Sequence, residues 1–269
     1  MRRQAARQRL GRRGVPLLLV GVGQVCWGIG FIAVPVTDQR GLVALLAVMP
    51  LSAWAWVWVA AGLIACASAF LPEGRDRWGY VAAVMPPLTW SLGYFWTAVQ
   101  TEYLRAVFVA LWYLLTHTFL ILWASSVAEY SIPRRKWRSR RAPPLYLFGV
   151  GMVTWAIGYV AAPSTNTRGL VPLLGIMPMK AWAAVWFFTG LITLTCMILP
   201  EGPDRWGFMG AAALPLLWAG SYAWEWITGD YERGAFVAVF YLTSQAGMAA
   251  WASGVPEYEL PHWAEERRA

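Results

Sequence analysis

Two polar side chains interrupt long apolar stretches of this sequence, and both are of types that bind ligands or carry protons. His117 stands in Thr-His-Thr near the middle of one stretch, and Gln245 holds the place 128 residues later in another. Hydrogen-bonding groups at that depth in a bilayer are costly unless they face protein or water. The pair therefore predicts either hydrogen bonds between helices or the lining of a polar pathway. The exchange of His for Gln argues against a proton relay at both places.

Apart from the acids in the first turn of a span, Glu225 is the only acid within the predicted spans, and it is the best single candidate for a binding site. It lies near the end of its span. Its carboxylate is therefore predicted to extend toward the bilayer surface.

A charged loop motif, Leu-Pro-Glu-Gly-x-Asp-Arg-Trp-Gly, occurs at 71–79 and again at 199–207. Pro-Glu-Gly predicts a tight turn, each Asp is placed to cap the next helix, and each Arg can reach lipid phosphates. A structural loop is the first interpretation, and a docking or substrate-gating loop is the alternative. Its charged residues are Glu73, Asp76, Arg77, Glu201, Asp204 and Arg205.

Other reactive groups are scarce. The sequence contains no nucleophile with a neighbouring base, no metal-ligand cluster and no phosphate-binding loop. Cys26, Cys66 and Cys196 fall in predicted spans, and none has a cysteine at the position 128 residues away. They are predicted to be small packing residues. We therefore expect no catalytic, cofactor or metal site and no enzyme activity.

The elements that carry these residues are predicted to be membrane-spanning helices. The chain is 58% hydrophobic and 13% charged, and its mean hydropathy is +0.46. Stretches nearly free of charge approach or reach the roughly 20 residues that cross a bilayer. They cover 15–35, 53–71, 107–128 and 181–200. This pattern predicts an all-α integral membrane protein.

The sequence contains two copies of one membrane-spanning unit. A shift of 128 residues aligns 21–130 with 149–258 without a gap, and about half of the aligned residues are identical. Each copy predicts four spans, with a short helix that ends at Met-Pro before the second span. Because four is even, both copies enter the membrane in the same direction, which predicts eight transmembrane helices as two parallel four-helix repeats. The predicted spans are Val15–Pro35, Pro50–Leu71, Arg77–Val99, Glu102–Ala128, Leu145–Pro163, Pro178–Leu199, Arg205–Thr228 and Asp230–Gly254.

Arginine clusters before the first span and between the copies predict the topology. Beside membrane helices they indicate cytoplasmic anchoring and not nucleic-acid binding. The first cluster also resembles the start of a signal peptide, but the matching second copy favours a retained helix. We expect a multi-pass protein of the bacterial cytoplasmic (inner) membrane with both termini in the cytoplasm. Its segments are a basic cytoplasmic stretch 1–14, repeat 15–132, a basic cytoplasmic linker 133–144, repeat 145–258 and a cytoplasmic tail 259–269. The expected partners are the lipid bilayer and, in a homo-oligomer, further copies of the chain.

Tryptophan is unusually abundant, with 19 residues. Seven pairs recur 128 residues apart, and they predict interfacial belts or helix packing, with a ligand cage as the alternative. The pairs are Trp27/Trp155, Trp54/Trp182, Trp58/Trp186, Trp78/Trp206, Trp90/Trp218, Trp96/Trp224 and Trp123/Trp251.

Glu102 with Arg105, and Asp230 with Arg233, open the fourth span of each copy. They predict interfacial anchors or a ring at a channel mouth.

Four short motifs in each copy resemble small four-span membrane proteins of actinobacterial phages and prophages, here tandemly duplicated. They are Met-Pro-x-x-Ala-Trp at 49–54 and 177–182, Gly-x-Asp-Arg-Trp-Gly at 74–79 and 202–207, Pro-x-x-Trp at 87–90 and 215–218, and Ser-x-Val-x-Glu at 125–129 and 253–257. The resemblance implies a phage-associated, non-enzymatic role in membrane modification or assistance to lysis. The alternative function is a small-solute transporter or channel with a site between the two repeats.

Overall fold

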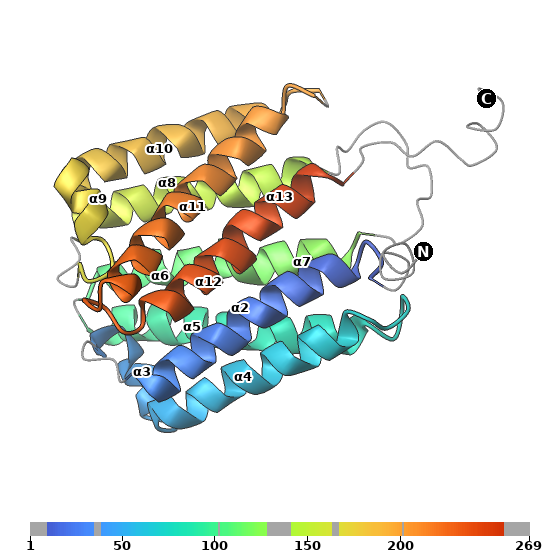
Figure 1. The fold of residues 1–269 in the computed structure, drawn as a ribbon, viewed down its shortest axis with the longest axis horizontal. Helices are drawn as coiled ribbons and strands as arrows, with labels where there is room; N and C mark the ends of the chain where they lie inside the picture. Colours follow the sequence, from blue (N-terminus) through green and yellow to red (C-terminus); the bar gives the residue numbers. More distant parts are fainter. Residues whose placement is uncertain are drawn as a thin grey trace.

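The computed structural model describes residues 10–34, 39–101, 103–127, 141–162, 167–200 and 202–255. Within these residues the chain is entirely helical, and its long helices run side by side in one bundle (Figure 1). Glu102, Glu201, most of the basic linker and the two chain ends lie outside the described residues. What the sequence predicts for them stays a prediction.

The amino-terminal half forms four long rods with one short interruption. Its elements are α2 (Gly14–Ala33), η1 (Arg40–Leu42), α3 (Val43–Leu46), α4 (Leu51–Ser68), α5 (Arg77–Gln100), α6 (Arg105–Tyr113), η2 (Leu114–Phe119) and α7 (Leu120–Ser125). The last three follow one another directly, so they form one rod. The predicted break at Met49-Pro50 is confirmed, because α3 ends before it and α4 begins at Leu51 after the extended backbone of Pro50.

The carboxy-terminal half has the same order of rods. Its elements are α8 (Ala142–Ala161), α9 (Val171–Ile176), α10 (Met179–Cys196), α11 (Arg205–Ile227), α12 (Gly234–Tyr241), η3 (Leu242–Gly247) and α13 (Met248–Ser253). Helix α8 begins three residues before the predicted start at Leu145, so the end of the predicted linker is helical. Pro143 and Pro144 allow this because a proline in the first turn loses no helical hydrogen bond.

Six of the rods are long and apolar enough to cross a membrane, which indicates a multi-pass membrane protein. They are Gly14–Ala33, Leu51–Ser68, Arg105–Ser125, Ala142–Ala161, Met179–Cys196 and Gly234–Ser253. Helices α5 and α11 are longer, with 24 and 23 residues, but they are not among the six. Proline, glycine, serine and the polar-edged aromatic residues lower their hydropathy.

The first and last rods of the two halves pack against each other, while α2 and α8 pack mainly against α4 and α10 of their own halves. Helix α2 contacts α12, η3 and α13, while α8 contacts α6, η2 and α7. Close approach depends on glycine at two places: a Cβ at Gly23 would lie 2.7 Å from Thr243 Oγ1, and one at Gly151 would lie 2.5 Å from Thr116 Cγ2. The two halves therefore contact each other through the first and last rods of each.

Buried tryptophans form the core of each half. Trp90 meets Trp54 and Trp58 edge-on at 5.5 and 5.3 Å between ring centroids. Trp218 meets Trp182 and Trp186 in the same way at 5.2 and 5.1 Å. These six residues pack helices, whereas Trp78, Trp96, Trp206 and Trp224 are exposed as belt residues would be.

Candidate functional site

Two π-helical turns lie where the halves meet, and they carry the polar residues singled out in the sequence. Turn η2 contains His117, η3 contains Gln245, and the two turns are in contact. A π-turn widens the helix by one residue and is frequent at functional sites. The structure thus brings the predicted pair to one seam, which we call the polar seam.

His117 is buried at 3% exposure and lies against the opposite half. Its ring stacks on Phe240 of α12 with 5.0 Å between centroids, and its Nδ1 lies 3.0 Å from the hydroxyl of Thr116. Its Nε2 has no hydrogen-bond partner among the described residues. One ring nitrogen is therefore fixed while the other faces the seam unpaired.

Gln245 is buried at 1% exposure, and neither its amide nitrogen nor its amide oxygen has a partner in the described part of the chain. Ser244 beside it donates to the carbonyl of Phe240, so the hydroxyl next to Gln245 is already engaged. An unpaired buried polar group costs about 1–3 kcal/mol. Buried water or a small polar molecule with both donors and acceptors would satisfy these atoms.

Gln24 is a further buried polar residue of the bundle, and sequence reasoning missed it. Its Nε2 donates to the carbonyl of Ala83 at 2.6 Å. Pro87 lies four residues after Ala83 and has no N–H, so that carbonyl has no helical donor. The signal was the combination of a proline inside the third predicted span with a glutamine inside the first.

Glu225 holds the short helix α9 and does not extend to the surface. Its carboxylate accepts backbone N–H groups from Gly169 and Val171, both at 2.7 Å, and the residue is 4% exposed. The prediction of a surface-seeking side chain is wrong, because two amide donors at the start of α9 satisfy both oxygens inside the protein. Glu225 also lines a cavity of about 530 Å³ with Arg168, Trp224 and Asp230.

The loop aspartates do not cap their helices. Asp76 and Asp204 occupy the N-cap positions, but neither makes a capping hydrogen bond. One carboxylate oxygen of each turns back and accepts the N–H of Gly74 or Gly202. The other oxygen pairs with an arginine: Asp76 with Arg13 at 2.6 Å and Asp204 with Arg141 at 2.9 Å. The capping prediction is wrong because a buried arginine attracts the carboxylate more strongly than a backbone amide does.

Arg13 joins three parts of the amino-terminal half. Besides Asp76, its Nη1 donates to the carbonyls of Ser125 and Val127 at 2.6 and 2.8 Å, and Glu73 lies at 3.9 Å. Burial opposes the charge, but the hydrogen bond to Asp76 and the nearby negative groups outweigh it and raise the pKa of the Arg13 guanidinium. The buried pair is a structural clamp.

The remaining loop arginines lie on the surface. Arg77 and Arg205 are exposed, and each stacks over the tryptophan that follows it at 5.3 Å. This geometry fits the predicted placement beside lipid headgroups.

Two more arginines connect the halves. Arg105 lies over Trp155 and Tyr159, while Arg233 lies over Trp27 and Phe31. The predicted pairing of Asp230 with Arg233 is absent among the described residues, since Asp230 accepts the hydroxyl of Thr228 instead. The arginines therefore act across the seam between the halves, through aromatic faces.

Comparisons with protein-family models, curated proteins and solved structures find no match for this chain.

Proposed function

We propose that this chain is a small-solute transporter or channel of the bacterial cytoplasmic membrane, with its site at the polar seam. The observation that carries the proposal is the set of unpaired buried atoms at His117 Nε2 and at both ends of the Gln245 amide. A neutral molecule with hydroxyl or amide groups, or a file of water, would satisfy them. Among the described residues the seam lacks a buried carboxylate, which argues for a neutral solute and against ion coupling.

The architecture we propose for this function is eight spans in two parallel four-helix repeats. It is supported by the similar lengths of α5 and α11, by the matching ion pairs of Arg13 and Arg141, and by the reciprocal contacts of α2 and α8. Sites between repeats are common in transporters. Reporters fused after residue 137 and at the C-terminus should both be active in the cytoplasm. Opposite sides at those two positions would contradict the parallel arrangement.

The function is tested with the full chain in vesicles under osmotic shock. Light scattering would follow the entry of water, glycerol and urea. We expect faster entry of at least one of them than in empty vesicles, and loss of that gain in the double variant His117→Leu, Gln245→Leu. The variant should keep its stability, since two unpaired polar groups are removed. The control is Thr195→Val, at an exposed hydroxyl away from the seam. Equal rates with and without protein for all three probes would contradict the proposal.

The phage-associated role in membrane modification or lysis is the second candidate. Exposed tryptophans favour it, because large indoles on the lipid-facing surface can disturb headgroup packing. They are Trp56, Trp78, Trp96, Trp206, Trp224 and Trp226. Induction would then depolarise cells, and the seam variants would have no effect on depolarisation. Cells that stay polarised would exclude this candidate.

A further inference from the structure

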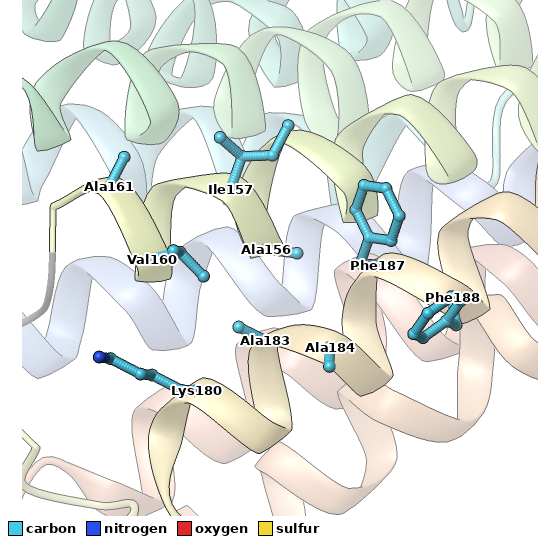
Figure 2. Close-up of a pocket in the computed structure, with 9 residues that line it drawn as sticks. All are labelled: Ala156, Ile157, Val160, Ala161, Lys180, Ala183, Ala184, Phe187 and Phe188. Atoms are coloured by element: carbon cyan, nitrogen blue, oxygen red, sulfur yellow. The ribbon is translucent and has the colours of Figure 1, made fainter.

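A groove between α8 and α10 combines an apolar floor with one charged mouth. It has a volume of about 360 Å³ and is lined by Ala156, Ile157 and Val160 of α8 and by Ala184 and Phe188 of α10, with Lys180 among its lining residues. Figure 2 shows Lys180 at one end of the groove and the two phenylalanines of α10 toward the other. Lys180 is exposed and makes no ion pair with any described residue.

We propose that this groove binds one anionic phospholipid of the surrounding bilayer, with its phosphate at Lys180 and one acyl chain along the groove. The proposal is independent of any solute at the polar seam. Eight residues separate Lys180 from Phe188, so the groove runs about 12 Å along α10, a length that suits the upper part of an acyl chain. Lysine beside apolar surface extends its ammonium to the headgroup level, where a phosphate is the complementary charge.

The corresponding surface between α2 and α4 differs at several positions that line the groove. Position 28 is glycine where position 156 is alanine, and a Cβ at Gly28 would lie 2.6 Å from the carbonyl of Ala55. The packing of α8 against α10 thus accommodates a methyl group that would clash at the corresponding position between α2 and α4. Serine stands at position 52 in place of Lys180, and Trp56 replaces Ala184. The amino-terminal half thus lacks the cation and carries a bulky indole where the acyl chain would lie.

Native mass spectrometry of the full chain, equilibrated with phosphatidylglycerol and phosphatidylcholine of identical acyl chains, tests the proposal. The wild-type protein should retain phosphatidylglycerol in preference to phosphatidylcholine. Lys180→Ser should lower retained phosphatidylglycerol about fivefold, the effect of one cation near the headgroups, and Lys180→Arg should preserve it. Ala184→Trp should lower retention of both lipids, because it fills the acyl position with the residue that the other half carries.

The matched control is Ser52→Lys, which adds a lysine at the corresponding position of the other half, where Trp56 replaces Ala184. It should gain no phosphatidylglycerol, and an equal gain there would mean that surface charge alone attracts the lipid. Equal retention by wild type and Lys180→Ser would overturn the proposal. So would a dimer that Ala184→Trp dissociates, because the groove would then belong to a second copy of the chain. Elution profile and unfolding temperature verify that each variant is folded.

Discussion

In the carboxy-terminal half, Glu225 binds the N–H groups of Gly169 and Val171, whereas the corresponding residue of the amino-terminal half is Thr97. Thr97 is buried, and its hydroxyl has no partner among the described residues. The backbone differs with the side chain. Gly169 adopts a left-handed conformation with φ of 84°, while the corresponding segment of the other half forms the 3₁₀ turn η1 (Arg40–Leu42). The carboxylate thus favours a turn that points two amides at it.

The halves agree in another contact to the same short helices. Trp54 donates its indole N–H to the carbonyl of Leu45 at 2.9 Å, and Trp182 donates to Leu173 at 2.8 Å. The indole contact holds the short helix in both halves, and Glu225 adds a second hold in only one. The same arrangement of helices can therefore bury a carboxylate where two backbone N–H groups donate to it.

The largest expected effect concerns a feature in which the halves agree. Arg13→Ala and Arg141→Ala should each lower the free energy of unfolding by about 3–5 kcal/mol, because each leaves a buried aspartate unpaired. Denaturant unfolding of the purified protein in detergent measures this. Arg75→Ala, at an exposed loop position, should change stability by less than about 0.5 kcal/mol. A large loss in only one half would break the equivalence of the two clamps.

A smaller effect sharpens the difference between Glu225 and Thr97. Glu225→Gln keeps one acceptor oxygen but turns an NH₂ group toward an amide donor, so it should cost about 2 kcal/mol. Thr97→Val should be close to neutral, since the hydroxyl has no partner among the described residues. Hydrogen exchange at Gly169 and Val171 should rise in Glu225→Gln. Unchanged protection there would show that the carboxylate does not hold α9.

The smallest effect concerns Gln24, whose counterpart is Met152. Gln24→Met should cost about 1–2 kcal/mol because the carbonyl of Ala83 loses its donor. The reverse change, Met152→Gln, should alter stability by less than about 1 kcal/mol, since the new bond to a carbonyl freed by Pro215 is offset by burial of an amide. Thermal unfolding of the two variants side by side measures both. Equal losses would mean that packing volume, and not the hydrogen bond, decides the outcome.

Helix positions and the breaks at Pro50 and Pro178 could be predicted from the sequence, because apolar length and proline act locally. The seam could be predicted only in part. His117 and Gln245 were found from their polarity, but their meeting depends on contacts of α2 and α8 with the opposite half, which no local pattern encodes. The partners of Glu225, Asp76 and Asp204 were missed for the same reason. The amide donors to Glu225 and the arginine partners of Asp76 and Asp204 lie 54 to 63 residues away in the sequence.

The contact between the first and last rods of the chain sets an order of events during synthesis. Helix α8 follows its partner rod α6–α7 directly along the chain, but α2 begins at Gly14 and its partner α12 begins only at Gly234. At typical synthesis rates of about 5–20 residues per second, α12 emerges roughly 10–40 seconds after α2. During that interval the glycine-lined face of α2 has only lipid or the insertion machinery beside it. The amino-terminal half must therefore persist as an unfinished unit, and its closure waits for the last helix to leave the ribosome.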